Sequence, residues 1–174
     1  MCSPKPICGA EEVILAEGLE YTVSEDGSYY IVNEMGECTR KRFIISDSYN
    51  GKPVKAITEA AFYEKDIIKV VLPDSIERIE ASAFCNCTSL KEVVLGNGLL
   101  TLGNKSFYGC RGLKSIVIPN SVTSIGDSVF HGCYKLKEIH YKGTKEKWLA
   151  IEKSDSWNYE IRSNYTIYCT DGEI

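Results

Sequence analysis

The stretch Leu113–Ile125 reads LKSIVIPNSVTSI, and two other stretches of the chain repeat its pattern. They are Ile67–Ile79, which reads IIKVVLPDSIERI, and Leu90–Leu102, which reads LKEVVLGNGLLTL. A fourth copy begins LKEIHYKG at Leu136 and then diverges. Successive copies are 23 residues apart, a period within the range of about 20–50 residues that marks solenoids and repeat arrays.

Many independent columns of residues keep this step of 23. The apolar columns are Val70, Val93, Ile116 and Ile139; Leu72, Leu95, Ile118 and Tyr141; Ile79, Leu102 and Ile125; and Phe84, Phe107 and Phe130. Phe62 precedes Phe84 by 22 residues, because the first unit lacks one loop residue. A unit of this size cannot bury its own apolar face, so the units must stack into one continuous core.

One coil can be interpreted residue by residue. In the coil that begins at Leu90, inward and outward residues alternate through Leu95, as in a half-buried strand. Gly96–Gly98 then turns the chain, and the pair Leu99 and Leu102 fits a short second strand or a tight bend. A small residue before each phenylalanine predicts a single helical or 3-10 turn that places the ring in the core. The expected column of stacked rings is Phe62, Phe84, Phe107 and Phe130.

Two further columns follow the phenylalanines. Asn86, Gly109 and Gly132 are residue types that accept a left-handed backbone, so we expect positive φ there. The next column consists of Cys87, Cys110 and Cys133, for which we expect small buried side chains with a weak thiol donor. We place Glu64 in this cysteine column in the first coil, which indicates that the thiol is dispensable.

The cysteines do not form a recognisable metal or disulfide pattern. Stacked coils put equivalent residues in a parallel column, whereas zinc needs converging ligands, so we predict no metal site. Disulfides between coils are conceivable from the coil spacing, but parallel side-chain directions suit them poorly. The state of Cys2, Cys8, Cys38 and Cys169, which lie outside the array, is left open.

Composition excludes several function classes. The 174 residues fit one domain, and the net charge of −4 lacks the basic character of nucleic-acid binders. No run reaches the roughly 18 apolar residues of a membrane span, and Val13–Ala16 is too short for a signal-peptide core. We therefore expect no nucleic-acid binding and no membrane insertion. The compartment stays open: the cytoplasm, or the cell surface or outside if an export signal was removed.

The stretch IPNSVTSIGDSVFHGCYKLKEI, from Ile118 to Ile139, resembles the BspA-type, or Treponema-like, leucine-rich repeat. The second copy departs at Gly96 and Leu100, and the first at Glu64 and Glu80, where cysteine and glycine are expected. The resemblance implies a leucine-rich-repeat solenoid of the α/β class, rich in β-structure. It also implies a domain for adhesion or protein binding, common in bacterial surface or secreted proteins, and it brings no catalytic residues.

The predicted organisation has four parts: an N-terminal tail (1–17), an N-terminal cap with a hairpin and an incomplete repeat (18–56), the repeats (57–141), and a C-terminal cap (142–174). Asp26 and Gly27 are the hairpin signal, and Phe43 mimics a repeat strand. The C-terminal cap is expected to contain a short helix over 145–153 and a final strand over 165–168. Such caps cover the core that terminal coils would expose.

Outward columns of the parallel sheet are the candidate partner-binding residues. They are Ile44, Val71, Val94, Val117 and His140, with a flanking row of Lys91, Lys114 and Lys137. An apolar outward column is notable because a solvated sheet face is usually polar, although valine also suits any strand. A second candidate surface is the column after the phenylalanines, Tyr63, Tyr108 and His131.

No catalytic constellation is present in the sequence. His131 and His140 fall in different repeat columns, and there is neither a phosphate-binding loop nor a nucleophile elbow. We therefore predict no enzyme and no cofactor, but a binding or adhesion module that presents an extended sheet to a macromolecular partner, such as a host or bacterial surface protein. The alternative is a structural spacer or self-associating domain of a larger surface assembly. The oligomeric state is left open.

Overall fold

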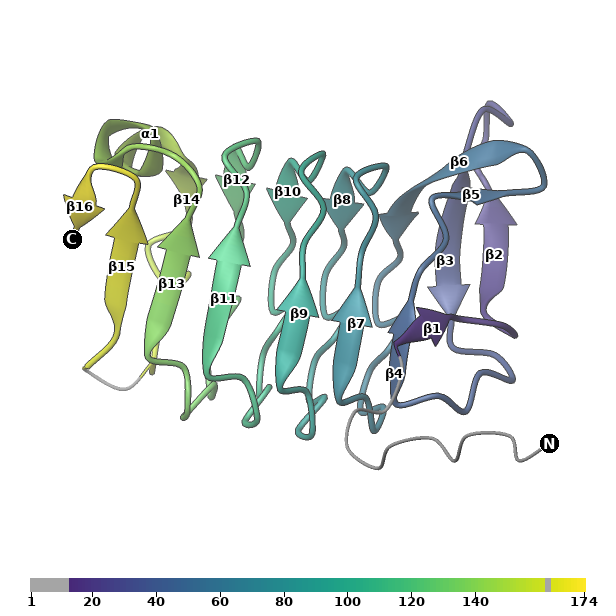
Figure 1. Ribbon diagram of the computed structural model, residues 1–174, viewed down its shortest axis with the longest axis horizontal. Coiled ribbons are helices and arrows are strands. Elements are labelled where there is room, and N and C mark those ends of the chain that lie inside the picture. The colour runs from purple at the N-terminus through teal and green to yellow at the C-terminus, as the bar shows by residue number, and fades with distance from the viewer. Residues whose placement is uncertain (1–12, 162–163) are drawn as a thin grey trace, which may run out of the picture.

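The computed structural model describes residues 13–161 and 164–174, and they form a solenoid whose coils stack side by side (Figure 1). Each repeat coil contributes one longer strand to a front row, one short strand to a back row and one run of turns. The front row contains β1 (Ile14–Leu15), β4 (Arg42–Ile44), β7 (Lys69–Val71), β9 (Glu92–Val94), β11 (Ser115–Ile118), β13 (Glu138–Tyr141) and β15 (Thr166–Cys169). The structure therefore confirms the predicted solenoid.

The back row is one continuous sheet in the order β14-β12-β10-β8-β6-β3-β2. Its strands are β2 (Glu20–Val23), β3 (Tyr30–Glu34), β6 (Lys52–Ile57), β8 (Arg78–Ile79), β10 (Thr101–Leu102), β12 (Ser124–Ile125) and β14 (Glu152–Lys153). All neighbours are parallel except the β2–β3 hairpin, and β5 (Ser48–Tyr49) pairs with β6. The second apolar pair of each repeat coil therefore lies at a short strand, as in β8, β10 and β12, and not in a tight bend.

The front row is not the single sheet that the sequence predicts. It consists of two four-stranded sheets, β1-β4-β7-β9 and β11-β13-β15-β16, and no strand pairing joins β9 to β11. The short strand β16 (Gly172–Glu173) pairs antiparallel with β15 and ends the second sheet. In Figure 1 the arrows of β9 and β11 stand farther apart than those of β7 and β9.

The core is the space between the two rows and the turns. Phe62, Phe84, Phe107 and Phe130 are fully buried, and their rings stack with centroid distances of 5.0, 5.3 and 6.0 Å. Phe43 extends the column, 5.8 Å from Phe62 and tilted by 39°. The repeat period of 23 residues therefore places one phenylalanine ring per coil in a row along the solenoid axis.

The segment around each phenylalanine is a run of single turns closed by hydrogen bonds from residue i+3 to residue i, and it does not extend into a helix. In the first coil, the Tyr63 N–H bonds to the Ala60 carbonyl, whereas the Phe62 N–H bonds to the carbonyl of Ala83 in the next coil. Ala60 and Glu64 have φ of 56° and 58°, and such left-handed residues interrupt a helix. Every second amide thus links neighbouring coils, which makes the turns a third hydrogen-bonded row.

The expected positive φ at Asn86, Gly109 and Gly132 is confirmed, at 59°, 69° and 72°. Glu64 belongs to this column and not to the cysteine column. The hydrogen bond from the Glu64 N–H to the Cys85 carbonyl is equivalent to the bond from the Asn86 N–H to the Tyr108 carbonyl one coil further on. The earlier placement is wrong because the residue missing from the first coil lies between Lys65 and Ile67. Before that gap, equivalent positions are 22 residues apart, so Lys65 occupies the cysteine column.

Both ends of the stack are covered. The β2–β3 hairpin lies at the N-terminal end, where Tyr21 stacks on Tyr49 with centroids 4.2 Å apart. Helix α1 (Lys145–Ala150) begins after Thr144, whose Oγ1 accepts the Lys147 N–H at 3.3 Å, and it buries Trp148 against the last coils. Within residues 13–161 and 164–174, no helix has the length and apolar character needed to cross a membrane.

The segment predicted as an N-terminal tail differs from that expectation. Ile14 and Leu15 form β1, which pairs parallel with β4 in the register Ile14 to Phe43 and Leu15 to Ile44. The pairing lengthens the front row by one strand. The predicted C-terminal cap contains α1 and β15.

Candidate functional site

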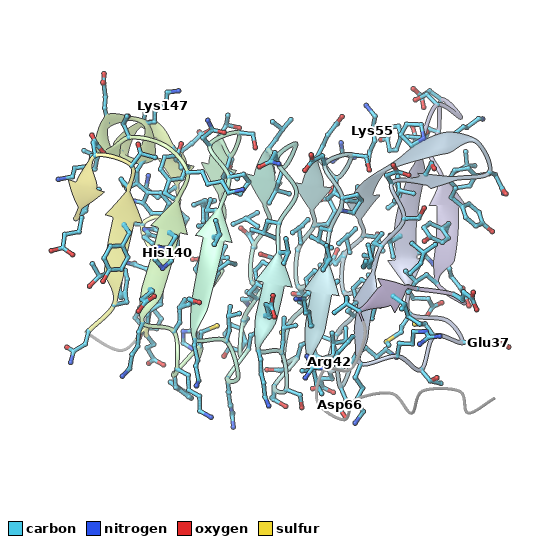
Figure 2. All side chains as sticks on the ribbon, in the orientation of Figure 1. Glu37, Arg42, Lys55, Asp66, His140 and Lys147 are labelled. Atoms are coloured by element: carbon cyan, nitrogen blue, oxygen red, sulfur yellow. The ribbon has the colours of Figure 1, made fainter. Side chains whose placement is uncertain are left out.

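Outward side chains of the front row form one solvent-facing column, which we call the apolar stripe and in which Ile44, Val71 and His140 are half-buried. Strand register places Leu15 beside Ile44, Ile44 beside Val71 and Val71 beside Val94, and then Val117 beside His140 and His140 beside Tyr168. The stripe therefore consists of Leu15, Ile44, Val71, Val94, Val117, His140 and Tyr168. Val94 and Val117 at its centre are 41% and 42% exposed. Figure 2 shows His140 over strand β13, on the face that this row presents.

Sequence reasoning found the five middle members of the stripe and missed both ends. Leu15 is 52% exposed and Tyr168 is 37% exposed. Neither residue belongs to a recognisable repeat, so the period of 23 could not align them with the others. The only sequence signal for their outward position was the alternation of inward and outward residues within the short strands that contain them. Tyr168 also stacks on the His140 ring at 4.9 Å, which orders the C-terminal end of the stripe.

A row of lysines runs along one side of the stripe. Lys91, Lys114 and Lys137 are exposed just before their strands, and none of them pairs with a carboxylate of the described residues. Two nearby carboxylates are already engaged: Glu92 bonds to Lys69 at 2.6 Å, and Glu138 bonds to the His140 ring at 3.0 Å. The side of the stripe along the lysine row is consequently positively charged, although the net charge of the whole chain is −4.

The lysine row borders a shallow hollow of about 410 Å³. It is lined by Lys114, Ser115, Tyr134, Lys135, Lys137 and Glu138. The Arg111 guanidinium lies 5.9 Å from the centroid of the Tyr134 ring, in a cation–π contact that fixes the ring at the rim. The hollow therefore combines three lysines with an exposed tyrosine.

A second hollow, of about 420 Å³, lies in the stripe itself, between β9 and β11. We call this opening the seam. Its walls include the side chains of Val94 and Val117, and Lys91 and Lys142 lie at its rim. The seam interrupts the front row and not the back row, since β10 and β12 pair in the regular register. Nothing in the sequence indicates the seam, because both strands have ordinary strand patterns.

The turn after β9 is tied to the preceding coil, on the side away from the seam. The Asn97 backbone N–H and side-chain Nδ2 donate to the Asp74 Oδ1 at 2.6 and 3.1 Å. Gly96 lies so close to the Pro73 carbonyl that a Cβ built there would be only 2.1 Å from its oxygen. These contacts hold the C-terminal end of β9 against its β7 neighbour.

The second candidate surface is a stack of rings on the turn edge. The rings of Tyr108 and His131 stack at 4.5 Å, and those of His131 and Tyr159 stack at 5.4 Å. His131 Nε2 also lies 3.5 Å from the Glu160 Oε2. Tyr63 stays exposed and is separated from this stack by Cys85, which occupies the same column. The structure thus brings Tyr108 and His131 together and leaves Tyr63 apart.

The cysteine column is structural. Cys87, Cys110 and Cys133 are fully buried, and burial raises the pKa of the Cys87 and Cys133 thiols to about 12. Cys38, Cys85 and Cys169 are also free thiols, and Cys2 and Cys8 lie outside the described residues. In the described part of the chain, no three side chains of the kinds that bind metals converge.

Known structures share this architecture. The chain is similar to a leucine-rich repeat protein from Bacteroides capillosus ATCC 29799, with 28% identity and a TM-score of 0.67 over 72% of this chain and 95% of that chain. It is also similar to the T. pallidum leucine-rich repeat protein, with 24% identity and a TM-score of 0.60 over 74% and 71%. A leucine-rich cell surface protein from Faecalibacterium prausnitzii A2-165 gives 26% identity and a TM-score of 0.51 over 78% and 41%.

The family of this chain is identified by a family model that matches most of its length. Curated proteins gave no match. Residues 55–164, which are more than half of the chain, match the family model described as the BspA type leucine-rich repeat region with 6 copies. This range contains the four mutually stacked phenylalanines from Phe62 to Phe130, the three thiols of the cysteine column and most of the apolar stripe. The chain therefore belongs to the BspA-type leucine-rich repeat family.

Proposed function

We propose that this chain is a protein-binding module that contacts its partner through the apolar stripe and the adjoining lysine row. The observation that carries the proposal is the stripe itself: within each of the two front-row sheets, neighbouring parallel strands place one apolar or aromatic side chain each in register, and Val94 and Val117 line the seam between the sheets. Contiguous exposed apolar surface is uncommon on monomeric proteins and marks interaction sites. The lysines favour a partner with an acidic contact surface.

The proposed setting is the bacterial cell surface. A structurally similar protein from Faecalibacterium prausnitzii is described as a leucine-rich cell surface protein. The family is one of repeat proteins, in which rows of equivalent side chains form extended binding surfaces. No group of the described residues suggests catalysis, because His131 and His140 lie in different rows of the solenoid. We therefore propose adhesion or partner binding without chemistry.

A photocrosslinking experiment tests the proposed surface. A photoreactive amino acid replaces Val94 in one sample and Leu149, an exposed residue of α1, in the other. Both samples are irradiated with bacterial surface extracts and with purified extracellular matrix proteins, and the adducts are identified by mass spectrometry. We expect a defined adduct from position 94 that is absent from position 149.

Affinity measurements on variants then decide the proposal. The double variant Val94→Glu/Val117→Glu should bind the crosslinked partner at least about tenfold more weakly, since it places two charges at the centre of the contact. Leu149→Glu, the matched apolar-to-charged control, should bind like the wild type. Unchanged affinity of the double variant would overturn the proposal.

Self-association through the same stripe is the second candidate function. Its basis is the same apolar column, which a second copy of the chain would also cover on dimerisation. Size-exclusion chromatography with light scattering distinguishes the two. A wild-type dimer that becomes monomeric in Val94→Glu/Val117→Glu favours self-association, whereas a wild-type monomer favours a foreign partner.

A further inference from the structure

The seam leaves backbone groups without the partners that they have at every neighbouring front-row junction. Between β4 and β7 the Ile45 N–H bonds to the Val71 carbonyl at 3.0 Å, and between β7 and β9 the Leu72 N–H bonds to the Val94 carbonyl at 2.9 Å. In the described chain, the equivalent bond from the Leu95 N–H to the Val117 carbonyl is absent. The seam is therefore open at its C-terminal end.

The N-terminal end of the seam is open as well. The Lys91 N–H bonds to the Ile68 carbonyl, and the Lys137 N–H bonds to the Lys114 carbonyl, each at 2.9 Å. Among the described residues, no such bond joins the Lys114 N–H to the Lys91 carbonyl. Of the four residues whose backbone groups lack these bonds, only Leu95 is buried, so its N–H most needs a partner, whereas the free backbone groups of the other three lie at exposed positions where water or a ligand can bind.

The seam is too narrow for a whole strand to enter. Inserting a strand requires about 9.6 Å between its two neighbours, twice the usual strand spacing of about 4.8 Å. Cα atoms of β9 and β11 lie within 8 Å of each other. The hollow has a volume of about 420 Å³, and the free groups at each of its ends include one donor and one acceptor, as a side-chain amide requires.

Positive charge marks both ends of the same hollow. Lys91 lies at one end, and Lys142, whose Nζ donates to the Asn97 Oδ1 at 3.1 Å, lies at the other. Glu92, the acidic residue in the lining, is already paired with Lys69. The electrostatic surroundings therefore favour carboxylates on both sides of whatever enters the hollow.

From these observations we propose that the seam seats an extended, acidic segment of a protein partner. The segment lies across β9 and β11, inserts one asparagine or glutamine side chain between Val94 and Val117, and pairs flanking carboxylates with Lys91 and Lys142. This inference rests on the proposed binding function and identifies the chemistry of the partner at the centre of the stripe. It gives the partner a fixed register on an otherwise repetitive surface.

Amide hydrogen exchange of the free protein tests the open seam first. The Leu95 and Lys114 amides should exchange at least about tenfold faster than those of Leu72 and Lys137, which are bonded in the equivalent positions. Comparable protection at all four amides would show a closed seam and would overturn the proposal.

A peptide titration followed by NMR tests the occupant. The probe is a capped heptapeptide with a central asparagine, flanked on each side by alternating glutamate and valine. The first control peptide has lysine for glutamate, and the second has alanine for the central asparagine. We expect saturable amide shifts at Leu95, Lys114 and Val117 with the probe, weaker binding of the alanine peptide and no binding of the lysine peptide. No saturable shift at millimolar probe, or shifts equally strong over β7, would overturn the proposal.

Lysine variants complete the test. Lys91→Gln/Lys142→Gln should raise the dissociation constant of the probe by about fivefold or more, because two ion pairs are lost. Lys65→Gln, on the turn edge, should leave it unchanged. If Val94→Glu/Val117→Glu abolishes binding of the crosslinked partner while Lys91→Gln/Lys142→Gln has no effect on the partner or the probe, the proposed function stands and the seam proposal falls. If neither double variant affects the partner, both fall.

Discussion

The thiol of Cys110 donates a hydrogen bond of 3.2 Å from its Sγ to the carbonyl oxygen of Phe84, a residue of the preceding coil. The same bond recurs from Cys87 to Phe62 at 3.0 Å and from Cys133 to Phe107 at 3.1 Å. Each thiol thus adds a second hydrogen bond to the carbonyl of a stacked phenylalanine, which already accepts a backbone N–H from its own coil. The cysteine column stabilises the solenoid through neutral thiol donors that link each coil to the preceding one.

The buried thiols should make the protein sensitive to alkali. Burial raises the pKa of Cys133 from its ordinary value of 9.0 to about 12, so the unfolded chain releases this proton at a lower pH than the folded chain does. The stabilisation is complete below pH 9 and is lost as the pH rises from 9 towards 12. The free energy of unfolding should fall by at most about 1.4 kcal/mol per pH unit for each such thiol. Urea unfolding between pH 8 and pH 11 measures this slope.

Cys133→Ser is the matched control for that slope. A serine hydroxyl can still donate to the Phe107 carbonyl but does not ionise in this range. The variant should therefore show a shallower decline of stability with pH than the wild type. Equal slopes would contradict the assignment of the alkaline effect to this column.

Phe107 should be among the most sensitive positions of the core. Its ring is fully buried between Phe84 and Phe130, at centroid distances of 5.3 and 6.0 Å. Phe107→Ala should lower the free energy of unfolding by about 3–5 kcal/mol, because it loses the burial and leaves a cavity. Tyr63→Ala, at an exposed position of the turn edge, should change it by less than about 1 kcal/mol. Denaturant unfolding of both variants checks the contrast.

The sequence predicted the phenylalanine column because a strict period of 23 fixes which residues are equivalent. The prediction is wrong at positions where the period of 23 is interrupted or absent. Glu64 was placed in the wrong column because the one-residue deletion lies after it, and Leu15 was overlooked because its strand belongs to no repeat. Sequence reasoning is therefore reliable for residues between intact repeats and weak at deletions and caps.

The seam was also beyond prediction from the sequence. Val94 and Val117 stand in equivalent columns, and their strands have the same alternation. Strands β9 and β11 belong to different sheets, and the turn after β9 is held to the preceding coil by local contacts such as the Asp74–Asn97 hydrogen bonds. Periodicity identifies which residues face outward but does not determine how closely two coils approach.

Strain at the turns can be relieved by glycine. Lys105 has φ of 56°, and its equivalents Ala60, Ser82 and Ser128 have φ of 56°, 57° and 52°. A left-handed backbone costs a residue with a side chain roughly 1–2 kcal/mol, and glycine avoids this cost. After the entropy that glycine loses on folding, Lys105→Gly should raise stability by about 0.5–1 kcal/mol. Lys105→Ala, which keeps the Cβ, should bring no such gain, and thermal unfolding distinguishes the two.

Trp157 closes the C-terminal end of the ring column, and its loss should act locally. It lies edge-on to Phe130 at 6.4 Å and to Trp148 at 5.6 Å, and it is only 9% exposed. Trp157→Ala should lower stability by about 3–5 kcal/mol. Because each coil contacts only its neighbours, the C-terminal coils should fray before the others.

Hydrogen exchange resolved by segment measures where that loss falls. In Trp157→Ala, the amides of β12 and β13 should lose protection, while those of β7 and β8 keep wild-type rates under native conditions. Leu149→Ala is the matched control, since Leu149 lies on the neighbouring helix α1 and is 70% exposed, so it should leave every segment protected. A uniform loss along the stack would mean that the solenoid unfolds as one cooperative unit and that the cap does not act through its nearest coils.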